Sequence, residues 1–158
     1  MPATTELELR LVAPDPGSTS ALGRALASVA RPGDLVCLWG DLGAGKTHLA
    51  KAFGAGLGVT GTITSPSFIL MAEYDGRLPL FHIDLYRLAD ATDVLAGGLV
   101  DHRQAAGVTL VEWPDRMRAA LPAGRLDVLI DGTGDEPRQI TLRAGDASYR
   151  RYLDAAAA

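Results

Sequence analysis

The sequence predicts an α/β fold, a three-layer sandwich around a mixed, mostly parallel central sheet. Short apolar runs, such as residues 35–39 and 108–112, are typical of strands buried on both faces of a sheet. Segments with the apolar spacing of helices alternate with these runs, which is the order expected when helices cover a sheet. Asp75-Gly76 is typical of a hairpin turn, and a second hairpin is expected near the C-terminus, so part of the sheet must be antiparallel.

Alternation and helical spacing define the elements in chain order. Polar and apolar side chains alternate in the first strand, and a turn cluster then leads into a helix whose N-cap is expected to be Ser18, Thr19 or Ser20. Glycines after residue 53 end a second helix. The predicted strands are 7–12, 35–39, 68–74, 78–84, 108–112, 126–130 and 139–143, and the predicted helices are 19–30, 44–57, 91–99, 116–121 and 147–154.

The composition is that of an ordinary globular chain. Its 158 residues suit a single domain, predicted over residues 1–154, with residues 155–158 expected to fray. No apolar run reaches the roughly 18 residues that span a bilayer, and the N-terminus lacks the basic start of a signal peptide, so we expect no membrane contact. The one cysteine, Cys37, excludes an intrachain disulfide, and a reducing, cytoplasmic location is expected. A net charge of −4 argues against a broad nucleic-acid-binding surface.

Eight consecutive residues match the phosphate-loop motif G-x-x-x-x-G-K-[ST] without a gap, and a buried strand precedes them while a helix follows. Glycines let backbone N–H groups wrap phosphate oxygens, and the start of a helix attracts anions. Lys46 would place a positive charge on the β- and γ-phosphates, and the Thr47 hydroxyl would ligate Mg²⁺. A glycine-rich turn with an incidental lysine would not explain the strand and helix around it. The sequence therefore predicts a P-loop NTPase with the phosphate-binding residues Gly40, Asp41, Leu42, Gly43, Ala44, Gly45, Lys46 and Thr47.

Two further predicted strands end in acids, Asp84 and Glu112. Ligands of open α/β sheets lie at the carboxyl ends of strands, so both acids are well placed to hold Mg²⁺ or to orient the attacking water. The alternative for either acid is a helix cap or a surface ion pair. His82 shares a sheet face with Asp84, and we interpret it as a half-buried, hydrogen-bonded histidine rather than a catalytic one. Trp113 is interpreted as a packing residue beside the site.

Ser65-Pro66-Ser67 lies between the phosphate-loop helix and the strand that ends at Asp84. In GTPases and related ATPases a switch loop in this position reaches the γ-phosphate and Mg²⁺. Ser65 or Ser67 could supply that hydroxyl, and a plain Ser-Pro turn remains the alternative.

The absence of one residue type from the chain indicates which nucleotide it binds. The chain has no asparagine, so the guanine-selecting N-K-x-D motif cannot occur and ATP is expected. A small-molecule P-loop kinase is the main alternative, although the short segment 84–107 is a weak candidate for the lid that such a kinase needs. A nucleotide-gated binding module, in which hydrolysis is incidental, is a third reading.

Four motifs, in order and spacing over residues 35–114, resemble the TsaE family, the ATPases of bacterial tRNA threonylcarbamoyladenosine biosynthesis. The phosphate loop is common to many families, whereas the later motifs are more specific. The four are the phosphate loop, Ser65-Pro66-Ser67-Phe68, His82-Ile83-Asp84-Leu85-Tyr86-Arg87-Leu88 and Val111-Glu112-Trp113-Pro114.

The resemblance implies an enzyme that binds ATP with Mg²⁺ and hydrolyses it slowly when alone. It implies TsaD and TsaB as partner proteins, which transfer a threonylcarbamoyl group to adenosine 37 of tRNA. A TsaE-like chain is then the ATP hydrolase that drives the complex and not the transferase, and it meets tRNA only indirectly through its partners.

The resemblance also assigns residues. Lys46 and Thr47 would hold phosphate and Mg²⁺, Asp84 would be the second-strand acid, and Glu112 would be the Mg²⁺-site acid that hydrolysis needs. Arg138, after a glycine-rich turn, resembles a late arginine near the nucleotide. The chain has Ser67 where the family usually has threonine, which keeps the hydroxyl but loses the methyl group that stiffens χ1.

Overall fold

The computed structural model describes residues 7–41, 43–61, 71–85, 102–115 and 121–158. Its strands are β1 (Glu8–Ala13), β2 (Leu35–Trp39), β3 (Met71–Tyr74), β4 (Leu80–Asp84), β5 (Val108–Glu112), β6 (Leu126–Asp131) and β7 (Arg138–Ala144). Over the described residues these strands form one sheet in the order β1-β7-β6-β2-β5-β4-β3. The four central strands, β6, β2, β5 and β4, are parallel, while β1, β7 and β3 join the sheet by antiparallel pairing. The prediction of a mixed sheet with a parallel middle is confirmed.

The parallel middle brings three strand ends to the same edge of the sheet. β5 lies between β2 and β4, with Glu112 opposite Leu38 on one side and opposite Asp84 on the other. The chain leaves β2 at this edge and enters the segment that matches the phosphate loop. The register of three strands therefore places both predicted acids beside that loop.

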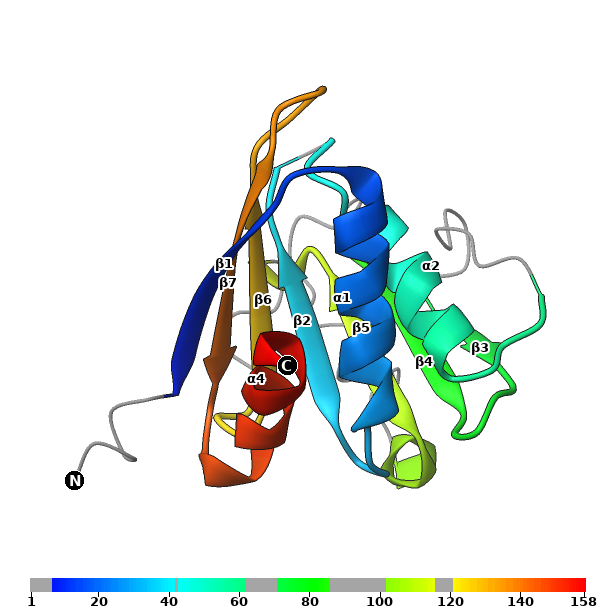
Figure 1. The fold of residues 1–158 in the computed structure, drawn as a ribbon. Helices are drawn as coiled ribbons and strands as arrows, with labels where there is room; N and C mark the ends of the chain where they lie inside the picture. The colour runs from blue at the N-terminus through cyan, green and yellow to red at the C-terminus, as the bar shows by residue number, and fades with distance from the viewer. Residues whose placement is uncertain (1–6, 42, 62–70, 86–101, 116–120) are drawn as a thin grey trace.

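The helices α1 (Pro16–Ser28), α2 (Lys46–Gly56) and α4 (Arg150–Ala157) pack on one face of the sheet (Figure 1). Two short 3-10 helices, η2 (His102–Ala106) and η4 (Ala147–Tyr149), precede β5 and α4. The main core lies under the three helices, and a smaller cluster lies on the opposite face around Cys37, Ile83 and Val111. Burial in this cluster raises the pKa of the Cys37 thiol to about 12. The helices predicted at 91–99 and, except for Leu121, at 116–121 lie outside the described residues.

α1 and α2 approach closely because glycines face the partner helix. A Cβ atom at Gly23 would lie 2.8 Å from the Cβ of Ala52, and one at Gly56 would lie 2.7 Å from that of Ala27. His48 adds a polar contact, with Nε2 lying 2.8 Å from the Ser20 hydroxyl. His48 is exposed, and this contact joins the two helices. These contacts fix the helix that carries Lys46 and Thr47.

Several predicted boundaries were wrong for identifiable reasons. α1 begins at Pro16, earlier than predicted, because Asp15 rather than a serine or threonine is its N-cap and accepts from the Ser18 N–H at 2.8 Å. That backbone hydrogen bond, with one from the Ser18 hydroxyl, lowers the pKa of Asp15. β4 begins at Leu80, directly after Pro79, which has no N–H to donate. The helix near the C-terminus, predicted to end at residue 154, continues to Ala157.

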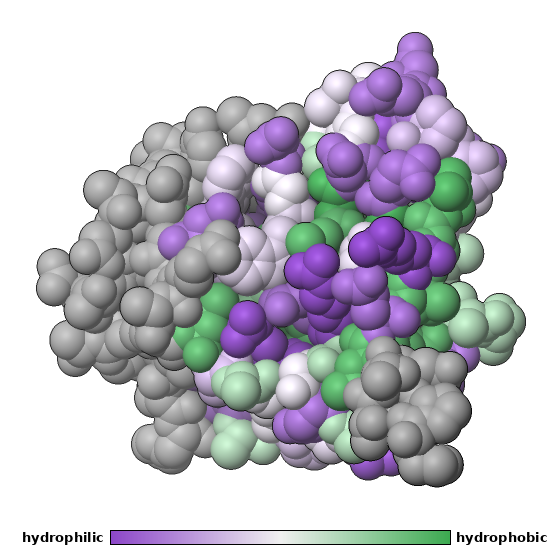
Figure 2. Space-filling model, turned by 90° about the vertical axis from the view of Figure 1, so that its left-hand side faces the viewer, coloured by the Kyte–Doolittle hydropathy of each residue, from purple (hydrophilic) through white to green (hydrophobic). Residues whose placement is uncertain are grey.

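β1 is an edge strand, and its outward side chains are the charged Glu8 and Arg10 and the apolar Val12. On the side of the molecule formed by β1 and β7, strongly hydrophilic residues lie in the middle, with hydrophobic residues beside them (Figure 2). Glu8 accepts hydrogen bonds from the Nε atoms of Arg143 and Arg10, at 2.8 and 3.1 Å, and the bond from Arg143 is the main cause of its lowered pKa. Charged side chains on an edge strand oppose pairing with another chain.

The buried carboxylate of Asp34 ties α4 to the turn before β2. It accepts from the Arg31 N–H at 2.9 Å, from the Arg151 guanidinium and from the Tyr152 hydroxyl. Burial, and secondarily this carboxylate, raises the pKa of Tyr152. Tyr149 adds a contact by accepting from the Leu35 N–H at 3.0 Å. The C-terminal helix is thereby fixed to the start of the central strand β2.

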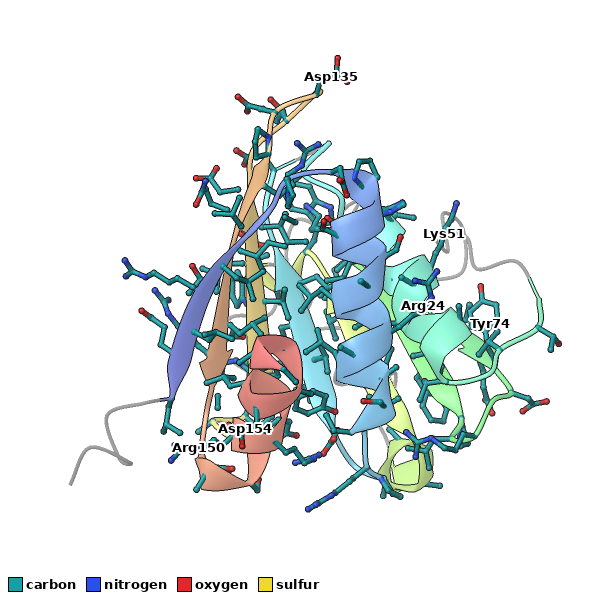
Figure 3. The ribbon with its side chains drawn as sticks, in the orientation of Figure 1. Arg24, Lys51, Tyr74, Asp135, Arg150 and Asp154 are labelled. Atoms are coloured by element: carbon teal, nitrogen blue, oxygen red, sulfur yellow. The ribbon has the colours of Figure 1, made fainter. Side chains whose placement is uncertain are left out.

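Replacing Asp34 by alanine is expected to lower the free energy of unfolding by about 2–3 kcal/mol, because buried donors on Arg151 and Tyr152 lose their acceptor. Urea denaturation measures the loss. Asp154→Ala is the matched control, since Asp154 lies exposed on α4, the helix that carries Arg151 and Tyr152 (Figure 3). Its loss is expected to change the free energy of unfolding by no more than about 0.5 kcal/mol. Equal losses in the two variants would contradict the structural role of Asp34.

Candidate functional site

The segment between β2 and α2 is shaped by three glycines with positive φ. Gly40, Gly43 and Gly45 have φ of 151°, 81° and 106°, a backbone region that other residues rarely adopt. At Gly40 a Cβ atom would also lie 2.6 Å from the Ile130 carbonyl oxygen. No side chain caps the first turn of α2, whose N-cap is Gly45. The backbone geometry is thus that of a tight loop opening onto the start of a helix, where anions bind favourably.

Lys46 lies over this loop rather than extending freely from it. Its side chain is buried, and Nζ donates to the carbonyl oxygens of Gly40 and, at 3.3 Å, Asp41. Nζ also lies 3.6 Å from the ring centroid of Trp113, a cation–π contact. Desolvation lowers the pKa of Lys46, while nearby carboxylates, that of Glu112 foremost, oppose the shift. The ammonium group therefore sits in a site already rich in negative charge.

Thr47 and Glu112, two of the three residues predicted to hold the metal, meet at the edge of the sheet. The Thr47 hydroxyl donates to Oε1 of Glu112 over 3.1 Å. Asp84 lies opposite Glu112 on the neighbouring strand. One hydroxyl and two carboxylates thus come from three elements that are distant in sequence.

The buried partner of Glu112 is a residue whose role sequence reasoning missed. Nε2 of His82 lies 2.6 Å from Oε2 of Glu112, and the two side chains are 0% and 3% exposed. His82 is therefore fully buried rather than half-buried, and its hydrogen-bond partner is the predicted hydrolytic acid. The one signal in the sequence was that His82 lies on the same sheet face as Asp84, the other acid at a strand end.

Trp113 combines backbone strain with a contact to the site. Its φ is 60°, the one positive value among the described residues other than glycine. Such a conformation costs of order 1–3 kcal/mol and is found more often at functional sites. The ring lies beside Lys46, so the prediction of a packing residue next to the loop is correct but incomplete.

Arg138, the first residue of β7, connects the β6–β7 turn to the glycine loop. Its guanidinium donates to the carbonyl oxygen of Ala44 at 2.9 Å, that of Gly43 at 3.3 Å and that of Gly134 at 3.0 Å. A cavity of about 250 Å³ adjoins this contact at the start of α2. Its lining includes Asp15, Thr19, His48, Asp135, Glu136 and Arg138.

The oxygen donors at the sheet edge fit a hard cation that is held together with another ligand. In the described part of the chain, no group of three or more His, Cys, Asp or Glu side chains is arranged to hold a metal ion. Mg²⁺ is commonly bound through one or two carboxylates together with substrate phosphates and water. Thr47, Glu112 and Asp84 match such a partial donor set. Two predicted ligand residues, Leu42 and Ser67, and the alternative Ser65, lie outside the described residues.

Comparison with known proteins identifies the family. The model of the family described as "Threonylcarbamoyl adenosine biosynthesis protein TsaE" matches residues 13–140, a range that contains every predicted site residue. The chain belongs to the TsaE family. This family takes part in the biosynthesis of threonylcarbamoyladenosine in tRNA.

Relatives and a solved structure agree with this membership. A tRNA threonylcarbamoyladenosine biosynthesis protein TsaE of Bacillus subtilis is 44% identical over 150 residues, which are 94% of this chain and 92% of the relative. The TsaE protein of Streptomyces coelicolor is 42% identical, and the match covers 77% of this chain and 86% of that protein. The crystal structure of Bacillus subtilis YdiB superposes with a TM-score of 0.74 at 37% identity, covering 95% of this chain and 94% of YdiB.

Among the helices that the structure describes, none is long and apolar enough to cross a membrane.

If the loop binds ATP as its motif predicts, Lys46→Ala is expected to raise the dissociation constant for ATP by about 10–100-fold, because a hydrogen bond to a charged group contributes about 1.5–3 kcal/mol. Nucleotide titration measures the change. Lys51→Ala is the control, because the only other lysine of the chain lies exposed one turn further along α2 (Figure 3) and its loss should leave affinity unchanged. A Lys46→Ala protein that unfolds while its folded fraction binds ATP normally would make Lys46 a structural residue instead.

Proposed function

We propose that this chain binds ATP with Mg²⁺ and hydrolyses it, and that this cycle drives threonylcarbamoyladenosine modification of tRNA. The observation that carries the proposal is the 3.1 Å contact between the Thr47 hydroxyl and the Glu112 carboxylate beside the glycine loop. These are the two types of group, one on the phosphate-loop helix and one at a neighbouring strand end, that hold Mg²⁺ in P-loop ATPases.

Phosphate binding would replace contacts that the loop now makes with itself. The Lys46 ammonium, held by the carbonyl oxygens of Gly40 and Asp41, would exchange these acceptors for phosphate oxygens. The uncapped first turn of α2 would supply N–H donors to the same anion. Bound Mg²⁺ would offset the negative charge of the phosphates next to Glu112 and Asp84.

Hydrolysis needs a group that fixes the attacking water. Glu112 is proposed for this role as well as for the metal site, because its carboxylate is buried at the strand end nearest Thr47. Asp84, opposite it on β4, would support the same metal site. Low exposure strengthens the attraction of the Lys46 ammonium for the negative charge that develops at the γ-phosphate.

The nucleoside is proposed to occupy the 250 Å³ cavity that begins at Ala44 and Gly45. Its position at the start of α2 allows a phosphate chain on the loop to continue into it. Arg138 would bind the nucleotide indirectly, by fixing the loop carbonyls of Gly43 and Ala44, as well as by lining the cavity. ATP is proposed rather than GTP because the chain has no asparagine for the guanine-selecting motif.

The remaining parts of the proposal follow from family membership. TsaD and TsaB would be the partners, in the cytoplasm, and they rather than this chain would carry out the transfer. Contact with tRNA would be indirect, as the net charge of −4 favours. A small-molecule kinase would instead phosphorylate a metabolite without partner proteins.

Glu112→Gln is expected to retain ATP binding while ATP hydrolysis falls by at least about 100-fold, the low end of what positioned acid–base and electrostatic groups contribute. Phosphate release in single-turnover reactions measures the effect. Glutamine keeps the volume of the side chain, and Glu73→Ala, at an exposed position of β3, controls for general loss of charge. Near-normal turnover of Glu112→Gln would remove Glu112 from the mechanism.

Depletion of the protein in its host is expected to lower threonylcarbamoyladenosine in total tRNA, measured by mass spectrometry of digested nucleosides. Re-expression of the unsubstituted chain should restore the modification, whereas the Lys46→Ala chain should not. An unchanged level of the modified nucleoside after depletion would refute the proposed pathway role.

A further inference from the structure

We propose that His82 is a positioning residue that holds the Glu112 carboxylate in the orientation ATP hydrolysis requires. This inference rests on the proposed function and adds a residue to it. Among the described residues, His82 makes a 2.6 Å hydrogen bond between its Nε2 and Oε2 of Glu112.

The two oxygens of Glu112 are held from opposite sides. Thr47, on the first turn of α2, donates to Oε1, and His82, on β4, contacts Oε2. In the proposed function Thr47 turns to Mg²⁺ when nucleotide binds. Among the described residues, His82 is then the hydrogen-bond partner that still restrains the glutamate. A glutamate side chain has several rotatable bonds, so this restraint decides where its carboxylate points.

The hydrogen-bond pattern of the ring fixes which atom donates. Nδ1 of His82 is buried and has no hydrogen-bond partner in the described part of the chain. A neutral ring with its hydrogen on Nε2 donates to the carboxylate and leaves only an unfilled acceptor at Nδ1. The other neutral tautomer would bury an unpaired N–H and bring the Nε2 lone pair against a carboxylate oxygen. Nε2 is therefore the donor to Glu112.

Burial of the polar His82 ring costs free energy, because one of its nitrogen atoms has no hydrogen-bond partner among the described residues. His82 is 0% exposed, and its neighbours along and across the sheet, including Leu80, Ile83 and Leu110, are apolar core residues. An apolar side chain in the same position would have no unpaired polar atom of its own, but Oε2 of the buried Glu112 would lose its hydrogen-bond donor. The retained cost points to a role that an apolar residue could not perform. Donation to Glu112 is the polar contact available for that role.

A positioning role predicts a specific pattern among amide substitutions. In His82→Gln the side-chain nitrogen takes the place of Nε2 and can still donate to Glu112. In His82→Asn the side-chain nitrogen takes the place of Nδ1, and the side chain is too short for that nitrogen to reach Glu112. Residues that orient metal ligands by hydrogen-bonding to them contribute about 10–100-fold to metal affinity or activity. We expect His82→Asn to lower the single-turnover rate of ATP hydrolysis by about 10–100-fold, and His82→Gln to stay within about threefold of the unsubstituted chain.

Two readouts separate positioning from a loss of structure. The dissociation constant for ATP with Mg²⁺ should change by less than about threefold in both variants, because His82 contacts the acid and not the nucleotide. In the Glu112→Gln background, His82→Asn should cause almost no further loss of rate, since the carboxylate to be oriented is gone. Urea denaturation confirms that each variant is folded. Should His82→Asn fail to fold, His82→Met, closer in volume and without a donor, carries the same expectation.

Three results would overturn the inference while leaving the proposed function intact. The first is an equal rate of ATP hydrolysis in His82→Asn and His82→Gln. The second is a loss of nucleotide affinity as large as the loss of rate. The third is a double variant of His82→Asn and Glu112→Gln whose loss of rate is the product of the two single losses. Absence of any ATP hydrolysis by the unsubstituted chain, alone and with its partner proteins, would overturn the proposed function and this inference together.

Discussion

The site depends on the register of the three parallel strands β2, β5 and β4. This register places Glu112 between the strand that enters the glycine loop and the strand that ends at Asp84. Glu112 can then contact Thr47 through one oxygen and His82 through the other. A shift of β5 by one residue would turn Glu112 to the opposite face of the sheet and break both contacts. The apolar core on both faces of these strands is what prevents such a shift.

The surrounding structure holds polar and strained groups that would not be stable alone. Lys46, His82 and Glu112 are buried, and Trp113 has a left-handed backbone conformation. Two devices stabilise the loop beside them: the close glycine-mediated contact of α1 with α2, and the hydrogen bonds from Arg138 to the loop carbonyls. Costs of this kind are tolerated where surrounding contacts determine the geometry.

Much of this arrangement could be predicted from the sequence, and the rest could not for physical reasons. The glycine loop is local in sequence, so its motif, strand and helix could be recognised together. Asp84 and Glu112 were found because they end apolar strands. The His82–Glu112 contact was missed because it depends on pairing between strands separated by about 30 residues. The Asp15 cap was missed because serine and threonine nearby offered equally good candidates, and the loop contacts of Arg138 depend on a hairpin far along the chain.

The central claim is that Thr47 and Glu112 form one cation and phosphate site at the sheet edge, with His82 behind it. A crystal structure with Mg²⁺ and a non-hydrolysable ATP analogue tests this most directly. We predict that Lys46 leaves the carbonyl oxygens of Gly40 and Asp41 for the phosphates, that oxygens of Thr47 and Glu112 face Mg²⁺, and that the His82–Glu112 hydrogen bond persists. A nucleotide bound away from this loop, or a Glu112 side chain turned away from Mg²⁺ with its contact to His82 broken, would contradict the account.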